Sequence, residues 1–480
     1  MMRSLFSGVA GLKTHQTKMD VIGNNIANVN TVAYKSQNVT FQELMYQTTQ
    51  NASGANAETG RGGINAKQIG LGVQTGAINA NITTSGASQS TGNPFDIQIK
   101  GDSFFIVSDG ANNYFTRAGA FYVDGQGNLA MTSNGYTVQG WQEDPTKPGT
   151  IIKDTVSPLK IMSAENMTSE PEQTTQSYLS GVIDKNSTQL SSTNGLIVNI
   201  GLYDNLGYSY IAKFAIKDDV TSAAGEKSYS FTPVDLVDSN GYSLKYSSDP
   251  TNPNYKPGYE KTGYDAPGGP GETDPTGFPK GMTIDGGTSV NITYDAENGT
   301  NKNVDASGND IPFKLEITGI DAFIGPIEIG VGKSTMYDNK GTSTIKGNSG
   351  NYEGQFAGRK VGEMSGVAIA QDGKITASYD NGTTKLLGQI AVANFANPSG
   401  LEKIGDNLYQ TTPNSGVFDG IGEDITSGSG AMSTGVLEMS NVDLSAEFTD
   451  MITTQRGFQA NSRIITVSDS LLEELTNLKR

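Results

Sequence analysis

The two ends of the chain carry apolar residues at a spacing of seven, and this pattern most constrains how the sequence can fold. Near the N-terminus the series is Leu5, Leu12, Met19 and Ile26. Three more apolar residues share that helical face after one shift of phase: Val9, Ile22 and Val29. The spacing predicts an amphipathic helix. We expect it to end within Asn24–Thr31, where asparagine side chains compete for backbone hydrogen bonds.

The C-terminal end repeats the pattern over a longer stretch. One unbroken column consists of Leu437, Leu444, Met451, Phe458, Ile465 and Leu472. The neighbouring column begins with an apolar residue and then becomes polar: Phe448, Gln455, Ser462 and Asp469. Such a seam is poor for an isolated two-stranded zipper and suits a helix packed among several neighbours. We predict a helix over Leu444–Leu478, about 50 Å long, with its cap in Ser440–Asp443.

Neither helix is expected to be stable alone, because most helical stability comes from packing. The alternative is that both are ordinary core helices of a globular protein. Their length, terminal position and polar seam favour intermolecular packing, so the sequence predicts a structural, self-assembling protein. The predicted assembly interface comprises Leu5, Val9, Leu12, Met19, Ile22, Ile26, Leu444, Phe448, Met451, Phe458, Ile465 and Leu472.

Between the helices the pattern changes to that of short strands. Residues 50–92 are rich in small and polar residues, as in Thr59–Gly63, and are expected to form an extended connector. From Pro94 apolar residues alternate, and Phe104–Val107 is typical of a buried strand. Asn-Gly and Asp-Gly pairs mark tight hairpins in which both turn positions adopt positive φ, here at residues 134–135, 372–373 and 381–382.

The two hairpin blocks flank about 200 residues, which indicates one split β domain with another domain inserted into it. Strands are expected in the insert at Leu196–Ile200, Tyr210–Ile216 and Lys314–Ile317, with an exposed loop over Tyr255–Pro279 that could divide it into two lobes. The predicted fold is therefore multi-domain and mainly β, with terminal helices paired as a coiled-coil-like unit. The predicted domains are 1–70 with 436–480, 71–165 with 360–435, and 166–359.

Composition excludes several classes of function. The 480-residue chain has a net charge of −17, which argues against nucleic acid and anionic membrane as partners. It has no cysteine, no apolar run long enough to span a membrane, and no cleavable signal pattern at its start. Cytoplasmic residence and export without a signal both stay open on composition.

No residues stand out as a catalytic or metal centre. His15 is the only histidine, lies in the N-terminal stripe, and is interpreted as a polar residue of the helix surface. Part of a calcium-loop spacing occurs at Asp305, Ser307, Asn309 and Glu316, but the sixth position is Asp310 instead of glycine. We therefore expect no enzyme, metal or cofactor, although the abundant carboxylates do not exclude a glycosidase-like pair.

Four blocks of sequence resemble bacterial flagellar rod and hook proteins. They are Asn24–Lys35, Asp96–Phe105 with Phe115–Gly119, Ala393–Leu401 and Leu437–Asn461, in the order found in that family. The motif residues that match are Asn24, Asn25, Asn28, Asn30, Tyr34, Lys35, Asn441, Asp443, Gln455, Arg456 and Asn461. Ala33 stands where the family usually has glycine, which puts a positive φ there in doubt. The insert shows no comparable match.

Within that family the length favours the hook branch. The resemblance implies extracellular subunits, exported without a cleaved signal by the flagellar type III apparatus, that polymerise into a curved tube acting as a universal joint. It implies as partners identical subunits, the distal rod, the hook cap and the hook–filament junction proteins, with no nucleic acid and no membrane insertion. The terminal helices would line the tube and the insert would face outward. A distal rod or junction protein is the alternative, and a surface carbohydrate-active enzyme is a remote one.

Overall fold

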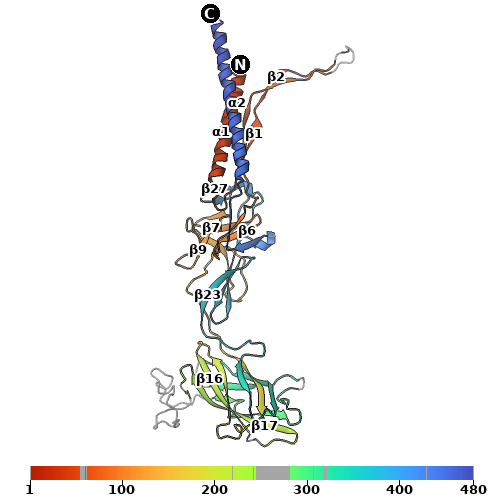
Figure 1. The fold of residues 1–480 in the computed structure, drawn as a ribbon, viewed down its shortest axis with the longest axis vertical. Coiled ribbons are helices and arrows are strands. Elements are labelled where there is room, and N and C mark those ends of the chain that lie inside the picture. The colour runs from red at the N-terminus through yellow and green to blue at the C-terminus, as the bar shows by residue number, and fades with distance from the viewer. Residues whose placement is uncertain are drawn as a thin grey trace. The chain divides into compact units, whose positions relative to one another are not determined.

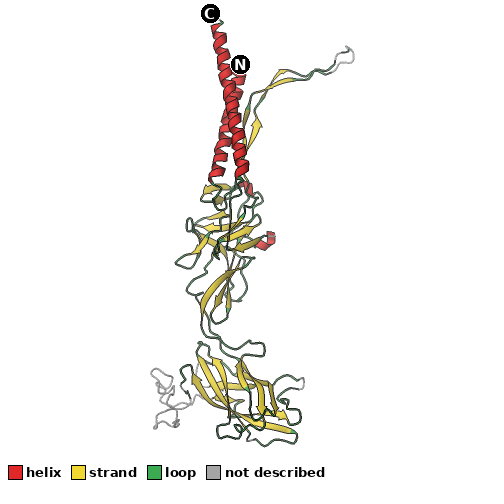
Figure 2. Cartoon of the chain, viewed as in Figure 1, coloured by secondary structure: helices red, strands yellow, loops and turns green. Residues whose placement is uncertain are grey.

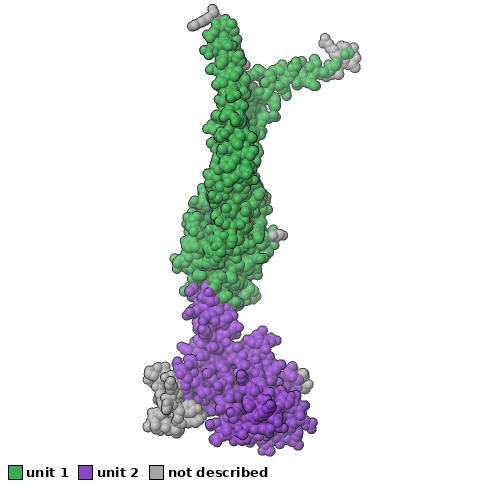
Figure 3. Space-filling model, in the orientation of Figure 1, with its two compact units in different colours: residues 1–166, 366–378, 384–480 green, residues 167–365, 379–383 purple. Residues whose placement is uncertain are grey.

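The computed structural model describes residues 2–54, 60, 62–218, 220–241, 243–244, 282–305, 308–317, 322–428 and 430–478. In this part of the chain the long helices lie at the two ends, and most of the rest is strand, turn or loop (Figure 2). A mainly β fold with terminal helices is thus confirmed. The chain divides into unit 1, residues 1–166, 366–378 and 384–480, and unit 2, residues 167–365 and 379–383 (Figure 3). The predicted loop Tyr255–Pro279 lies outside the described residues.

The two terminal helices of unit 1 are α1 (Met2–Ala27) and α2 (Leu444–Asn477), close to the predicted bounds. The cap of α2 is Asp443, whose side chain accepts from the backbone N–H groups of Ser445 and Ala446 at 2.8 and 3.3 Å. A carboxylate at this position also complements the positive end of the helix dipole. Leu437 does not belong to the helical column as predicted, because it lies in β30 (Val436–Glu438), which pairs with β5 (Ser88–Ser90).

The predicted connector contains strands that the sequence analysis did not identify. After α1, β1 (Gln37–Glu43) pairs antiparallel with β4 (Val73–Ala80). Beyond them β2 (Tyr46–Gln50) and β3 (Lys67–Gly70) form an arm that projects away from the helices and whose residues are all exposed (Figure 1). An arm that buries no side chain needs no apolar alternation, so the pattern that predicts strands is missing. Thr59 and Arg61 lie outside the described residues.

The main sheet of unit 1 takes strands from both hairpin blocks. Its path includes β25-β11-β7-β8-β28-β27. The bounds are β25 (Thr384–Ile390), β11 (Thr137–Gln142), β7 (Phe104–Ser108), β8 (Asn113–Thr116), β28 (Leu408–Gln410) and β27 (Glu402–Gly405). The first block meets the second where Trp141 pairs with Gln389 and where Phe115 pairs with Tyr409. The Phe115, Trp141 and Tyr409 side chains are buried in a common core.

The remaining strands of unit 1 are short. They are β6 (Ile97–Lys100), β9 (Phe121–Val123), β10 (Leu129–Met131), β12 (Ser157–Pro158), β24 (Lys374–Tyr379), β26 (Val392–Ala393) and β29 (Ala431–Thr434). The last residue of β24, Tyr379, is assigned to unit 2. β24 pairs with β25. β6 pairs with β29, so this pairing again joins segments that are far apart in the sequence.

The tight turns differ in one respect from the prediction. Gly135, Gly373 and Gly382 have φ of 75°, 80° and 80°, but the residues before them do not have positive φ. Each preceding side chain instead accepts the N–H two residues on: Asn134 from Tyr136, Asp372 from Lys374 and Asn381 from Thr383, at 3.0–3.1 Å. The side-chain hydrogen bond stabilises the turn without a positive φ at the first position, so the prediction of positive φ at both positions is wrong.

Within the described residues, unit 2 contains a five-stranded and a four-stranded sheet over one core. The first has the order β18-β20-β21-β14-β22 and the second β15-β16-β17-β19. Their bounds are β14 (Gln176–Asp184), β15 (Leu196–Tyr203), β16 (Ser209–Lys217), β17 (Glu226–Asp238), β18 (Met282–Ile284), β19 (Val290–Asp295), β20 (Phe313–Ile317), β21 (Ile327–Tyr337) and β22 (Lys346–Ser349). The three strands predicted in the insert are confirmed as β15, β16 and β20. Leu179, Phe214 and Ile329 are fully buried where the sheets meet.

Two strands remain. β13 (Thr168–Ser169) pairs with β23 (Gly362–Ile369), whose first residues belong to unit 2. No helix in the described part of the chain is long and apolar enough to cross a membrane.

Candidate assembly site at the paired terminal helices

Helices α1 and α2 lie side by side and run in opposite directions (Figure 1). At one end of the pair the Ser4 and Ser468 hydroxyls are 3.4 Å apart. Further along, the Lys18 ammonium is 3.2 Å from the Asp450 carboxylate. At the other end the Asn25 amide donates to Glu447 at 2.9 Å. The start of the chain therefore packs along the end of the same chain, mainly through polar contacts at these positions.

Small residues bring the two helices close together. A Cβ placed on Gly11 would lie 2.8 Å from Asn461, and one on Gly457 would lie 2.7 Å from the His15 ring. A side chain at either glycine would therefore force Asn461 or His15 to move. Thr14 and Thr454 are also almost fully buried. The seam within one chain is thus formed largely by glycine, hydroxyl and amide groups.

His15 lies at this contact and is half-buried, so the polar helix-surface residue predicted from the sequence is partly covered. Its ring meets Phe41 of β1 edge-on, with centroids 5.5 Å apart. Its Nδ1 is buried and has no hydrogen-bond partner in the described part of the chain. Burial, with a smaller effect of the nearby Lys18 charge, lowers the pKa of His15. The folded helix pair therefore favours the neutral imidazole.

The predicted interface residues are distributed unevenly around the pair. Ile22 alone among them is buried, at 3% exposure. Those that are half-buried are Leu5, Leu12, Met19, Ile26, Met451, Phe458, Ile465 and Leu472. Those that are exposed are Val9, Leu444 and Phe448, at 54%, 38% and 50%.

Other exposed apolar side chains lie on the same two helices, outside the twelve predicted interface residues. They are Met2, Phe6, Ile452, Ile464, Val467, Leu471 and Leu475. On α2, Ile464, Val467, Leu471 and Leu475 follow one another at spacings of three and four. This is itself a helical stripe, so the sequence carried a signal for these residues beside the seven-residue column. A helix pair with so many exposed large apolar residues has apolar surface that the chain itself does not cover.

At the base of the helices the motif asparagines form a compact junction. The Asn25 amide, 1% exposed, bonds both backbone groups of Gln37, accepting from N at 3.0 Å and donating to O at 2.8 Å. It also accepts from the Tyr34 hydroxyl at 3.2 Å. The Asn24 amide donates to the same hydroxyl, and the Asn28 amide donates back to Asn24. These bonds fasten the end of α1 to the start of β1.

A buried ionic network lies next to this junction. The Lys35 ammonium is 2.6 Å from the Glu438 carboxylate and donates to the Thr84 carbonyl at 2.8 Å. Arg117 Nε lies 3.4 Å from the second Glu438 oxygen. The side chains of Lys35, Arg117 and Glu438 are at most 1% exposed. Burial lowers the pKa of Lys35, the Glu438 contacts oppose this, and Arg117 adds repulsion.

Further contacts tie the network to the backbone. Arg117 donates to the carbonyls of Gly101 and Ser103 at 2.7 and 2.8 Å, and Gly86 N donates to Glu438 at 3.0 Å. The Asn441 side chain accepts from Ser36 N at 2.7 Å and donates to Asn81 O and Thr84 O. Segments from both ends and the middle of unit 1 are thereby joined.

Ala33 completes the junction in an unusual conformation. Its φ is 57°, it is 1% exposed, and its N–H donates to the Glu438 carbonyl at 2.8 Å. The chain therefore adopts positive φ here although the residue is alanine. A Cβ in this region costs about 1 kcal/mol or more, and the surrounding hydrogen bonds offset it.

Four other motif residues do not join the junction. Asn30, Gln455 and Arg456 are exposed, and Arg456 bonds Gln459 along α2 at 3.3 Å. Asn461 lies against Gly11 and donates to Gly457 O. Glu438 and Arg117, by contrast, are central, although the sequence analysis assigned them no role. Both lie within the family-like blocks, but the sequence around a charged residue gives no sign that its side chain is buried.

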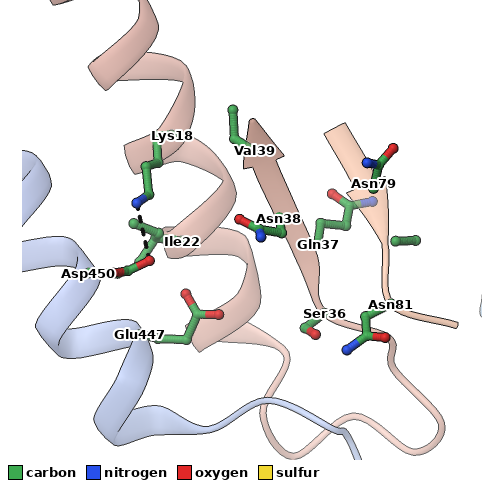
Figure 4. A pocket seen from close by; sticks show the side chains of 11 residues that line it. Lys18, Ile22, Ser36, Gln37, Asn38, Val39, Asn79, Asn81, Glu447 and Asp450 are labelled. Atoms are coloured by element: carbon green, nitrogen blue, oxygen red, sulfur yellow. Dashed lines mark ion pairs between the residues drawn. The ribbon is translucent and has the colours of Figure 1, made fainter. Parts of the chain in front are cut away.

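A groove of about 450 Å³ lies between α1, the start of α2 and strands β1 and β4 (Figure 4). The Lys18–Asp450 ion pair crosses one side, and Ile22 and Val39 contribute apolar surface. Burial raises the pKa of Glu447. The remaining lining is mostly amide and hydroxyl groups. In the described residues no group of three or more His, Cys, Asp or Glu is placed to hold a metal ion.

Comparison with known proteins gives consistent matches along the chain. Residues 5–35 match the family described as flagella basal body rod protein, residues 98–170 the flagellar hook protein FlgE/F/G D1 domain, and residues 433–478 the flagellar basal body rod FlgEFG protein C-terminal region. Over the full length of both chains, the chain is 34% identical to the flagellar hook protein FlgE of Treponema pallidum and 36% identical to that of Borreliella burgdorferi.

More distant similarity extends to a rod protein and a solved structure. The chain is 28% identical to the flagellar basal-body rod protein FlgG of Bacillus subtilis, over all of both chains. The crystal structure of the Helicobacter pylori flagellar hook protein FlgE2 aligns with 73% of this chain and 100% of that chain, at 15% identity and a TM-score of 0.38.

Proposed function

Because the chain belongs to the family of the flagellar hook protein FlgE, we propose that it is a structural subunit of the bacterial flagellar hook. Identical copies self-assemble into a curved helical tube that acts as a universal joint and transmits torque from rod to filament. Heterologous contacts that do not close on themselves generate such a tube from one kind of subunit.

The observation that carries this proposal is the apolar surface left on the paired helices. Phe448, Ile452 and Val467 of α2 and Phe6 and Val9 of α1 are 50–65% exposed. Burying a side chain of this size is worth about 2 kcal/mol, so covering several of them between copies favours polymerisation. Within each copy, α1 and α2 pack against each other mainly through glycine, hydroxyl and amide groups. Their exposed apolar faces are therefore available to contact other copies.

We propose that the twelve residues predicted from the heptads, together with these exposed neighbours, form the assembly interface. In this arrangement α1 and α2 act as a coiled-coil-like unit that lines the tube. The domains are 1–70 with 436–480 for the helical core and connector, 71–165 with 360–435 for a middle β domain, and 166–359 for an outer one. The motif residues at the junction, Asn25 and Lys35 above all, position the helices on the β domain.

The proposed location is outside the cell, after export by the flagellar type III apparatus without a cleaved signal. The proposed partners besides identical subunits are the distal rod, the hook cap and the hook–filament junction proteins. The role is structural and uses no enzymatic activity or cofactor. The similarity to FlgE proteins over the whole chain supports these assignments.

Two other functions make different predictions. A distal rod protein is favoured by the full-length similarity to a rod protein, but this similarity is lower than that to hook proteins. A hook–filament junction protein is the other alternative in this class. A carbohydrate-active surface enzyme would stay monomeric and keep its activity after both helices are removed.

Electron microscopy of purified protein and of a deletion strain distinguishes these functions. We expect curved tubes from the protein, and cells whose basal bodies keep a rod but lack hook and filament. Missing rods would indicate a rod protein, hooks without filaments a junction protein, and intact flagella would exclude all three.

Proteolysis tests whether assembly orders the ends of the chain. We expect residues 1–30 and 440–480 to be cleaved in the monomer and protected in the polymer, because isolated helices of this kind gain stability from packing. Equal protection in both states would contradict coupling between folding and assembly.

A further inference from the structure

A small cavity on unit 2 combines aromatic, carboxylate and amide groups. It has a volume of about 200 Å³ and lies beside the central strands β14 and β21. Gln176 pairs with Glu328 and Tyr178 with Gly330 across these parallel strands. Alternate residues such as Leu179 and Ile329 point into the core, so this lining lies on the opposite face of the sheet.

A tyrosine held by an aspartate covers the cavity. The Tyr352 hydroxyl donates to the Asp310 carboxylate at 2.6 Å, and its ring meets that of Tyr178 at 4.9 Å and 66°. A Cβ on Gly330 would lie 2.6 Å from that carboxylate and 3.1 Å from the hydroxyl, so the glycine makes room for both. Burial and Asp310 raise the pKa of Tyr352, which keeps its hydroxyl a donor. The wall is therefore positioned by specific contacts.

Polar groups in the lining retain free hydrogen-bonding capacity. Gln176 donates to one oxygen of Glu328 at 3.3 Å, and the Asn351 carbonyl oxygen accepts from two backbone N–H groups of its own loop. In the described part of the chain nothing bonds the other Glu328 oxygen, the Gln176 oxygen or the Asn351 amide nitrogen. Acceptors and a donor are thus available together beside two aromatic rings.

We propose that this cavity binds one neutral sugar ring, from a free saccharide or the end of a glycan. Sugar hydroxyls both donate and accept, which matches the carboxylate and amides, while the C–H face of the ring packs on tyrosine. The volume suits a single ring. The Asp310 and Glu328 carboxylates in the lining oppose an anionic ligand. The Lys333 ammonium, 5.3 Å from the Tyr352 ring centroid, offsets part of their attraction for a cationic one.

The site is independent of the assembly interface, and its test uses the full-length monomer. Saturation-transfer NMR with glucose, galactose and N-acetylglucosamine measures binding, with glucosamine and glucuronate as charged comparators. We expect at least one neutral sugar to bind with a dissociation constant of about 1 mM. A glycan array then distinguishes a free monosaccharide from a glycan end.

Matched variants locate the binding. Tyr352→Ala and Tyr178→Ala should each weaken it about tenfold, and Glu328→Gln about threefold. Tyr352→Phe, which keeps the ring, should retain most binding. The exposed residues Tyr337 and Glu316 supply controls, since Tyr337→Ala and Glu316→Gln should leave binding unchanged.

Three results would overturn the proposal. The first is no transfer to any neutral sugar, and the second is stronger binding of glucosamine or glucuronate. The third is unchanged binding in both tyrosine-to-alanine variants, with folding verified by circular dichroism. Polymerisation of all variants should stay normal, so failure here leaves the hook assignment untouched.

Discussion

Replacing Glu438 with glutamine tests how much the buried ionic network contributes to stability. The substitution keeps the shape of the side chain but removes the carboxylate charge that Lys35 and Arg117 share. Both cations would stay at most 1% exposed, with carbonyl oxygens as their remaining acceptors. The glutamine amide would also place N–H groups beside a donor. In the folded state the charges of Lys35 and Arg117 are then no longer balanced by a carboxylate, whereas the unfolded chain, in which these groups are solvated, is hardly affected.

The expected loss is about 4 kcal/mol in the free energy of unfolding, the range observed when one partner of a buried ion pair is removed. The chain has a single tryptophan, Trp141, which is buried in the core of unit 1. Its fluorescence during urea unfolding of the monomer therefore reports on the unit that contains the network. Glu402→Gln, at an exposed position in β27, is the charge-matched control and should change stability by less than about 0.5 kcal/mol.

A double-mutant cycle separates loss of charge balance from other effects. Adding Lys35→Met to Glu438→Gln removes one of the two uncompensated cations. The double variant should thus cost at least about 1 kcal/mol less than the sum of the single changes. Losses that add up, or a loss below about 1 kcal/mol for Glu438→Gln, would refute the view that these charges depend on one another.

Three further results are expected. Ala33→Gly should stabilise unit 1 by about 0.5–1 kcal/mol in the same assay, because glycine adopts the positive φ of 57° without the strain that a Cβ causes. A decrease in the free energy of unfolding would mean that Ala33 is not strained. The folded-state pKa of His15 is lowered, so the stability that its neutral form gives the folded protein is complete above about pH 6.5 and is lost as the pH falls through the folded-state pKa. Thermal melts at a series of pH values should show this loss. His15→Gln should weaken the pH dependence if His15 is its source. Phe448→Asp should raise the critical concentration for polymerisation about tenfold or more by light scattering, because it adds a charge to an apolar contact, while Gln455→Asp, also exposed on α2, should not; equal effects would indicate that charge alone matters.

Part of the fold follows from local pattern. Helix ends near Ala27 and Leu444 follow from asparagine competition and a capping acid, which act within a few residues. Strands such as β7 and β15 follow from short apolar runs. The exposed arm of β2 and β3 does not, because its strands bury nothing and so carry no alternation.

The candidate site divides in the same way. The sequence by itself determined that each end is an amphipathic helix, since a seven-residue period defines an apolar face without its partner. Only the tertiary structure decided that the two helices meet through Gly11, Gly457 and Asn461, leaving residues such as Phe448 exposed. The helices approach closely because glycine has no side chain, and a glycine adds nothing to the apolar periodicity from which the helices are predicted. Likewise Lys35 pairs with Glu438, which lies 403 positions away in the sequence. Local sequence patterns cannot indicate such a pair, because only the tertiary fold brings the two residues together.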